Sequence, residues 1–156
     1  MILVVAGLAL ATGVGSALLP LINAEAYALV TAAGATSLTV AAVVVALSVG
    51  QTIGKLVLFE TARRGSGRLP RLTRRRPSAS ARATRWTERV GGWLRSDRTG
   101  PPVVLAAAAV GIPPLAIVSV VAGAAGQRRR IFIPLCLVGR LARFTVLVLP
   151  LVALGR

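Results

Sequence analysis

The feature that most limits the fold of this chain is a basic segment that separates two long apolar stretches. Twelve of the 19 lysines and arginines are arginines between Arg63 and Arg98, and against Glu88 and Asp97 they leave this segment with a charge of +10. The flanking residues are so apolar that the whole chain is 55% hydrophobic. A folded chain of 156 residues has too little interior to bury that much Ala, Val and Leu. The sequence therefore predicts a single integral membrane domain over residues 1–156.

The arginines predict the direction in which the first long apolar run crosses the bilayer. A helix over residues 37–60 rises by about 1.5 Å per residue and is long enough to cross the hydrocarbon core. The loop over residues 61–99 is expected on the cytoplasmic side, because arginine-rich loops stay there. This span therefore runs from outside to inside.

The next apolar stretch, residues 100–127, begins and ends next to arginines. Arg128, Arg129 and Arg130 follow it at once, so both of its ends are expected on the cytoplasmic side. Gly111-Ile112-Pro113-Pro114 stands in its middle, and a straight helix does not accept that sequence. We expect a re-entrant helical hairpin with Pro113 and Pro114 at its tip, followed by a span over residues 131–155.

Residues 1–36 repeat this layout, since two apolar arms meet at Pro20 and Glu25 lies shortly after it. The span that follows starts outside, so this hairpin is expected to enter from the outside. The predicted fold is an all-α integral membrane protein: an inverted repeat of re-entrant helical hairpin plus transmembrane helix, joined by a basic cytoplasmic loop. Many secondary transporters have such repeats. The alternative is that Met1–Leu19 crosses the bilayer completely.

Small residues recur every four positions along the 37–60 span, at Ala42, Ala46, Gly50 and Gly54. They give the helix one face on which another helix can approach closely. We therefore expect helix packing along this face.

Three ionisable residues are predicted near the middle of the bilayer. Arg140 and Arg143 lie about 14 and 18 Å into the last span and, at positions i and i+3, share a helix face. Each costs about 2.5–3.5 kcal/mol to insert, so neither is expected to face lipid. Glu25, at the tip of the first hairpin, leaves an excess of one positive charge. A phosphate would neutralise that excess, and the guanidinium fork suits phosphate oxygens.

Asn23, Gln51 and Lys55 complete the predicted substrate-binding set. Asn23 and Gln51 would add neutral hydrogen-bond donors. For Lys55, which stands close to the end of its span, snorkelling to the cytoplasmic interface is favoured over a role in the site. A structural interpretation competes with the binding site: Glu25 and one arginine would then only lock the hairpin to the span.

Several chemistries are not expected of this chain. It has no histidine and a single cysteine, Cys136, and its four acids are not clustered. This composition therefore argues against a catalytic metal site, and it excludes a hydrolase that depends on histidine. Gly54-Lys55 lacks the upstream glycine and the following Ser or Thr of a nucleotide-binding loop. We predict no enzyme activity, no metal and no cofactor.

Within the basic loop, four apolar residues recur at helical spacing: Trp86, Val90, Trp93 and Leu94. The pattern predicts a short amphipathic helix on anionic lipid, with Trp86 and Trp93 at the membrane surface. Nucleic-acid binding is the competing interpretation of so many arginines, but a loop tethered between two spans favours lipid contact. The expected partners are membrane lipids, anionic or phosphate-bearing, and no nucleic acid; a homo-oligomer is compatible with the sequence.

Three short motifs occur in a familiar order. They are Pro20-Leu21-Ile22-Asn23-Ala24-Glu25-Ala26, then Gly50-Gln51-Thr52-Ile53-Gly54-Lys55 with Phe59 and Arg63-Arg64, then Ala122-Gly123 with Phe132 and Gly139. In this order they resemble the proline–acidic hairpin, the glycine-rich first span and the second hairpin with last span of the DedA family (the VTT, or SNARE-associated Golgi protein, superfamily). The resemblance covers residues 15–64 and 105–145.

Members of that family are associated with lipid scrambling or flipping, including the recycling of polyprenyl phosphate carriers in bacteria, and some with proton coupling. The resemblance implies a multi-pass protein of the cell (inner or plasma) membrane that moves phosphate-bearing lipids. The chain departs from the family at Lys55, where an aspartate is usual, and at Pro113-Pro114, where an arginine is usual. Proton coupling is therefore not implied, and Arg140 and Arg143 are candidates to replace the missing arginine. The alternative function is a non-transporting structural or assembly factor.

Overall fold

The computed structural model describes residues 2–19, 23–65, 81–96 and 98–154, and only the backbone of residues 81–87. In these ranges it has seven helices and no strand, which confirms the all-α prediction for the part of the chain described. The predicted hairpin tip at Pro20 and the side chain of Trp86 lie outside the described residues.

The first half contains helices α1 (Ile2–Leu18), α2 (Ala24–Gly34) and α3 (Ser37–Gly65). Asn23 has an extended backbone, and its side-chain oxygen accepts hydrogen bonds from the N–H groups of Glu25 and Ala26. This N-cap satisfies two donors at the start of α2 and so fixes where that helix begins. Helix α3 continues past the predicted 37–60 span to Gly65.

The second half contains helices α5 (Ala81–Arg95), α6 (Gly100–Ala109), α7 (Leu115–Ala124) and α8 (Arg129–Leu154). Pro101 and Pro102 stand in the first turn of α6, where a missing N–H has no helical partner to lose. The chain turns between α6 and α7 at Gly111, whose φ of +86° favours glycine.

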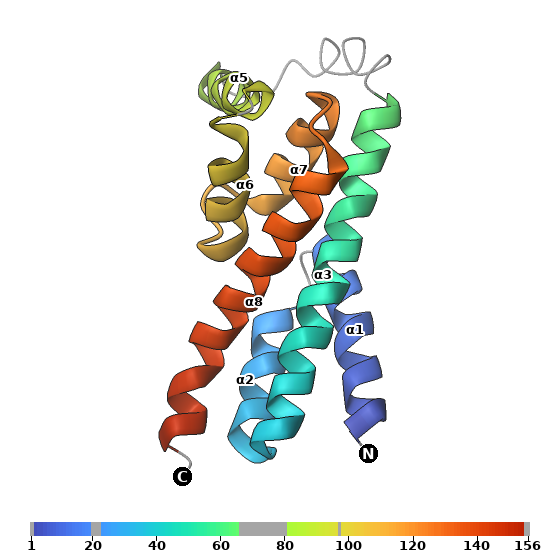
Figure 1. Ribbon diagram of the computed structural model, residues 1–156, viewed down its shortest axis with the longest axis vertical. Coiled ribbons are helices and arrows are strands. Elements are labelled where there is room, and N and C mark those ends of the chain that lie inside the picture. Colours follow the sequence, from blue (N-terminus) through green and yellow to red (C-terminus); the bar gives the residue numbers. More distant parts are fainter. Residues whose placement is uncertain (1, 20–22, 66–80, 97, 155–156) are drawn as a thin grey trace.

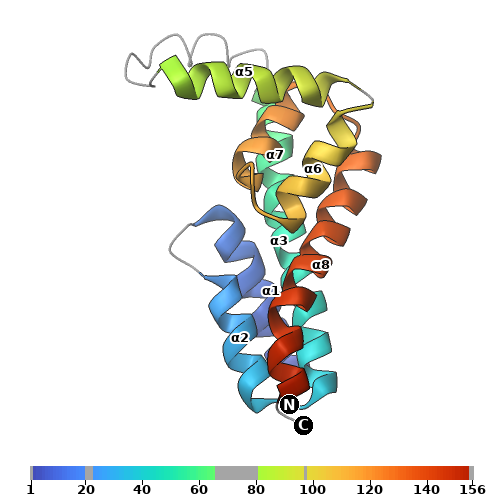
Figure 2. The ribbon, with the colours of Figure 1, turned by 90° about the vertical axis from the view of Figure 1, so that its left-hand side faces the viewer.

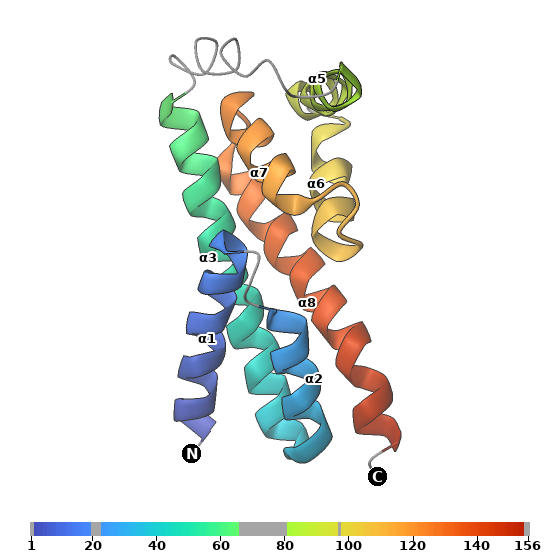
Figure 3. The same ribbon diagram turned by 180° about the vertical axis from the view of Figure 1, so that it is seen from behind.

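Helices α3 and α8 run the length of the bundle, and each half adds a pair of short helices (Figure 1). We call α1–α2 the first hairpin and α6–α7 the second hairpin. The first hairpin lies at the end that holds both termini, and the second lies at the opposite end. The end of α1, the start of α2 and the α6–α7 turn all come near the middle of the bundle (Figure 3).

The two hairpins pack on the long helices in a crossed manner. The first helix of each hairpin packs on the long helix of its own half, α1 on α3 and α6 on α8. The second helix reaches the long helix of the other half, α2 on α8 and α7 on α3. The halves are therefore held together by the second arm of each hairpin and by the direct packing of α3 on α8.

Two helices, α3 with 29 residues and α8 with 26, are long and apolar enough to cross a bilayer. The helices α1, α6 and α7 are shorter and apolar. At about 1.5 Å per residue, α6 and α7 are each roughly half as long as the hydrocarbon core is thick.

The core has two clusters, one in each half of the bundle's length. Phe59 and Phe132 stack with ring centroids 4.6 Å apart in the cluster near the second hairpin. Leu47 and Phe144 are fully buried in the cluster near the first hairpin. Cys136 is a buried free cysteine of the first of these clusters.

Helix α5 lies across the end of the bundle, roughly perpendicular to the long helices (Figure 2). Two of its apolar residues, Val90 and Leu94, are buried against the second-hairpin cluster, whereas Trp93 is 51% exposed. Part of the predicted apolar face is therefore buried inside the protein and part is exposed, because α5 packs on the ends of α6 and α7.

Candidate functional site

Arg143 of α8 joins the two hairpins at the middle of the bundle. Its Nε and Nη2 donate to one carboxylate oxygen of Glu25 at 2.8 and 2.5 Å, and its Nη1 donates to the carbonyl of Val110 at 2.6 Å. Glu25 lies in the first turn of α2, and Val110 follows the last residue of α6. One guanidinium thus binds the first hairpin through its acid and the second through its backbone.

Asn23 places Glu25 for this contact. By capping α2, the Asn23 side chain sets the position of the first helical turn, where a carboxylate also interacts favourably with the helix dipole. The predicted role of Asn23 as a neutral donor to substrate remains a prediction, since the described contacts use its oxygen as an acceptor.

Lys55 is buried, with 6% of its surface exposed, and its ammonium donates to the carbonyl of Ala17 at 2.7 Å. Ala17 is the penultimate residue of α1, where unsatisfied carbonyls give the helix end a partial negative charge. The snorkelling interpretation is therefore wrong for the described arrangement: the side chain points into the bundle, because the end of α1 offers a nearby acceptor.

Arg140 has no such acceptor. Its Nε is buried without a hydrogen-bond partner, and no hydrogen bond or ion pair joins Arg140 to another described residue. Lys55, Arg143, Glu25 and Cys136 are its electrostatic neighbours. Three cations against one carboxylate leave a local charge of +2, one more than the sequence predicted, because Lys55 is present as well. Glu25 is already bound to Arg143, so the excess falls on Lys55 and Arg140.

A polar face of α3 borders these charges. Gln51 and Thr52 are 7% and 6% exposed and Ser48 is fully buried, at helical spacing from Lys55. The Gln51 amide donates to the Ser16 hydroxyl at 2.9 Å, while its oxygen is buried without a partner. The predicted donor Gln51 thus faces α1 and lies one turn from Lys55.

Glycines allow the close helix approach on which the site depends. A side-chain carbon at Gly50 would collide with the Leu10 carbonyl of α1, and one at Gly54 with the Ala17 side chain. Of the other two residues of the predicted packing face, Ala46 packs against the first-hairpin cluster and Ala42 is half-buried.

The turn of the second hairpin is fitted around Arg143. A side-chain carbon at Gly111 would come within 2.8 Å of Arg143 Nη1. Pro113 and Pro114 follow, and Pro114 occupies the N-cap position of α7. Both prolines therefore lie in the α6–α7 turn. They follow Gly111 in the chain, whereas Val110, which accepts the hydrogen bond from Arg143, precedes it.

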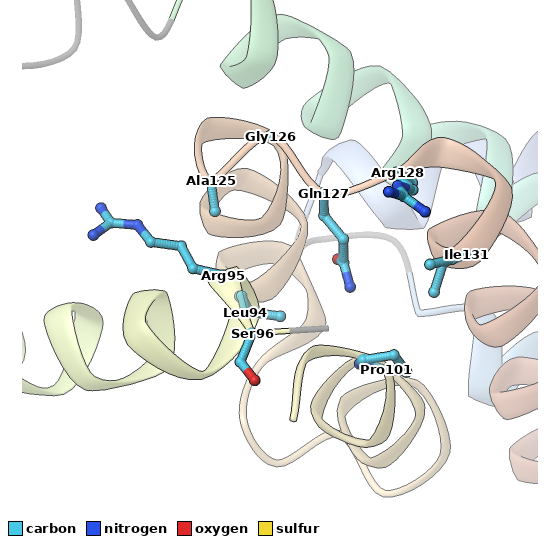
Figure 4. Close-up of a pocket in the computed structure, with 9 residues that line it drawn as sticks. All are labelled: Leu94, Arg95, Ser96, Pro101, Ala125, Gly126, Gln127, Arg128 and Ile131. Carbon is cyan, nitrogen blue, oxygen red and sulfur yellow. The ribbon is translucent and has the colours of Figure 1, made fainter. Parts of the chain in front are cut away.

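A separate recess of about 100 Å³ lies where α5, α6, α7 and α8 meet, at the α5 end (Figure 4). The Gln127 side chain points into it and its amide oxygen is buried without a partner, whereas Arg95 points away. Nearby, Arg129 of α8 pairs with Glu60 of α3, with Nη2 2.9 Å from a carboxylate oxygen. These contacts tie the ends of the long helices together, away from the central charges.

The described residues contain no group of three or more His, Cys, Asp or Glu side chains that could hold a metal ion. Arg140, Lys55 and the Gln51 amide are hydrogen-bond donors at the centre, and donors of this kind can bind an anion.

One further signal in the sequence favours the site role of Lys55 over the snorkelling interpretation. Gly54-Lys55-Leu56 with Phe59 and Gly139-Arg140-Leu141 with Phe144 share the same residue spacing. The match indicates that Lys55 and Arg140 are corresponding positions of the two halves. The sequence offered no comparable signal for the Val110 carbonyl, because any residue carries one.

Comparisons of the chain with protein-family models, with curated proteins and with solved structures found no match.

Proposed function

We propose that the chain is a multi-pass protein of the cell membrane that moves phosphate-bearing lipids between leaflets. The observation that carries the proposal is Arg140: a guanidinium at the centre of the bundle, without a partner among the described residues, while the nearby acid is bound to Arg143. An unpaired charge is costly away from water and is retained where it serves binding.

The fold supports a membrane role for the bundle. The helices α3 and α8 are long enough to serve as spans, and the short helices enter from opposite ends, with the end of α1, the start of α2 and the α6–α7 turn near the middle. In a bilayer this would be an inverted repeat with two re-entrant hairpins, and the charged centre would lie near the midplane. Ligand sites of secondary transporters are built in this way.

The charge at the centre favours a phosphate-bearing ligand. Lys55 and Arg140 lie together in excess over acids, and Gln51 adds an amide. Arginine binds phosphate oxygens in a fork, and lysine acts on them as a point charge. The sequence resemblance to the DedA family points to the same class of substrate, and membership of that family is part of this proposal.

A second candidate, a non-transporting structural factor, is favoured by the Arg143 bridge. One side chain that binds both hairpins would stabilise the bundle whether or not a lipid is moved. The two candidates differ in what Arg140 does, since it takes no part in that bridge.

The deciding experiment is lipid translocation in proteoliposomes. We compare fluorescent phosphatidylglycerol with a fluorescent glycolipid that lacks phosphate, for the parent, for Arg140→Gln and for the control Arg130→Gln, which changes an exposed arginine of α8. We expect Arg140→Gln to remain folded and to slow phosphatidylglycerol at least about tenfold, because a charge-assisted hydrogen bond is lost. Arg130→Gln should transport like the parent.

Parent-like phosphatidylglycerol transport by folded Arg140→Gln protein would contradict the phosphate site. Equal transport of the two lipids by the parent would contradict a phosphate-selective function. If the parent moves neither lipid, the proposed lipid transport is contradicted.

A further inference from the structure

Lys55 and Arg140 occupy corresponding places in the two halves. The glycine before each of them lies against the penultimate alanine of a short helix: Gly54 against Ala17 of α1, and Gly139 against Ala108 of α6. Since α3 and α8 run in opposite directions, these two contacts are related by an approximate twofold rotation (Figure 1).

The phenylalanines that follow extend the correspondence to the other arm of each hairpin. Phe59 of α3 lies beneath Gly123 of α7, where a side-chain carbon would collide with the Phe59 backbone. Phe144 of α8 is buried in one cluster with Ala24 and Ala28 of α2. Each long helix thus meets the second arm of the opposite hairpin at the residue five positions beyond its glycine.

The polar contacts break this symmetry. Lys55 binds the carbonyl of Ala17 at the end of α1, whereas Arg140 makes no corresponding bond to Ala108 at the end of α6. The carbonyl end of α6 is instead bound by Arg143, through Val110. One of the two equivalent cations is therefore bound to a helix end, and the other has no hydrogen-bond partner among the described residues.

The ion pair between Glu25 and Arg143, which maintains this asymmetry, has no counterpart at the corresponding positions of the other half. Leu58 stands in α3 where Arg143 stands in α8, and Ala116 is the second residue of α7 as Glu25 is of α2. The Glu25–Arg143 pair is thus an addition to the repeat, and it keeps Arg143 on the end of α6.

We infer that Lys55 and Arg140 are two alternative anion-binding positions, used in turn. In the described conformation Arg140 is open to a lipid phosphate and Lys55 is held by the end of α1. In a second conformation, related by the twofold correspondence, Arg140 is held by the end of α6 and Lys55 is open. A phosphate would pass from one cation to the other as the hairpins exchange, and this inference rests on the proposed function.

Binding of fluorescent phosphatidic acid to the protein in maltoside detergent, which contains no phosphate, tests the two positions. We compare Lys55→Met, Arg140→Met, the double variant and the exposed control Arg130→Met. We expect each single variant to keep measurable binding through the other cation, the double variant to lose it, and the control to bind like the parent. Loss of all binding in Arg140→Met, with Lys55→Met unaffected, would overturn the inference while leaving a phosphate site at Arg140. If the parent does not bind the lipid, the proposed function itself fails.

The exchange has a second readout that needs no ligand. Spin labels at Leu38→Cys, an exposed residue of α3, and Ile112→Cys, an exposed residue beside the α6–α7 turn, are placed in a Cys136→Ser background. These two positions do not correspond in the repeat, so the distance between them differs in the two conformations. Lys55→Met removes a bond that only the described conformation has, and Arg140→Met removes the corresponding bond expected only in the second. We expect the population ratio of two label distances to change about tenfold, in opposite directions for the two variants. Shifts in the same direction, or none, would overturn the exchange.

Discussion

Arg143 donates two hydrogen bonds to one oxygen of Glu25, although 118 positions separate these residues in the sequence. The Arg143 side chain is 24% exposed and that of Glu25 38%, so neither is fully enclosed by the protein. The pair joins the second arm of the first hairpin to the long helix of the other half. Arg143 also binds the end of α6, at the turn of the second hairpin, by donating a hydrogen bond to the Val110 carbonyl.

This relationship predicts a non-additive effect on stability. Glu25→Gln and Arg143→Gln should each lower the midpoint of thermal unfolding in detergent, because each leaves its former partner without a counter-charge. The double variant should recover most of the loss, with a coupling energy of about 1–2 kcal/mol. The pair Glu60 and Arg129, at the exposed end of the bundle, provides the matched cycle and should couple more weakly. Equal and additive losses in both cycles would mean that Arg143 does not hold the hairpins.

The helix approach at Gly50 predicts a steric effect. Gly50→Ala places a methyl group against the Leu10 carbonyl, so α1 must move away from α3. We expect a loss of about 1–3 kcal/mol in the free energy of unfolding. Gly7→Ala is the control, because no atom lies within 4 Å of its added carbon. That change should be neutral or slightly stabilising, as alanine favours a helix. A Gly50→Ala protein as stable as Gly7→Ala would show that the two helices are not in close contact.

The helices and their breaks could largely be predicted from the sequence. Long apolar runs and the prolines at positions 20, 113 and 114 are local signals, and α1, α2, α6 and α7 lie in the apolar stretches on either side of these prolines. The cap formed by Asn23 was not predicted. The α-helical period also placed Arg140 and Arg143 on one face. It could not decide which of the two reaches Glu25, because that depends on the angle at which α2 crosses α8.

The direction of Lys55 could not be predicted for a similar reason. From the sequence, a lysine near the end of a span can reach water along its own helix. The close approach of α1 at Gly50 and Gly54 places the Ala17 carbonyl within reach instead. For the same reason Val90 and Leu94 of α5 are buried, since the ends of α6 and α7 lie directly beneath them. Each of these differences between prediction and structure follows from a contact between segments that are distant in the sequence. The spacing of apolar residues along one helix carries no information about such contacts.

The proposed orientation in the membrane predicts a labelling pattern. Ser96 and Gln127 lie at the α5 end of the bundle, while Thr36 lies between α2 and α3 at the other end. In a Cys136→Ser background, single cysteines at positions 96 and 127 should react with a membrane-impermeant maleimide only from the cytoplasmic side. A cysteine at position 36 should react only from outside. Labelling of position 127 from the outside would mean that α6 and α7 cross the bilayer rather than form a re-entrant hairpin.

The position of α5 across the bundle predicts the depth of Trp93. The chain has two tryptophans, so Trp86→Phe leaves Trp93 as the sole reporter. Because the Trp93 side chain is half-exposed at the end of the bundle, we expect it to lie among lipid headgroups. Its fluorescence should be quenched more strongly by lipids brominated near the headgroup than by lipids brominated near the chain end. Quenching by aqueous acrylamide as efficient as that of free indole would place α5 in water.

The turn of the second hairpin allows the Arg143 contact to be tested by substitutions at two uncharged residues, Gly111 and Gly126. Gly111 and Gly126 both have positive φ, +86° and +76°, so alanine costs about 1–2 kcal/mol of backbone strain at either position. Only at Gly111 does the added carbon also meet Arg143, 2.8 Å from Nη1, whereas at Gly126 nothing lies within 4 Å. Gly111→Ala should therefore lower the free energy of unfolding by more than Gly126→Ala does. The difference should disappear in an Arg143→Gln background, where the guanidinium is absent. We would measure all four proteins by thermal unfolding in the same detergent. If the difference between the two alanine variants persists without Arg143, it arises from the turn itself, and the described contact between Arg143 and the second hairpin is wrong.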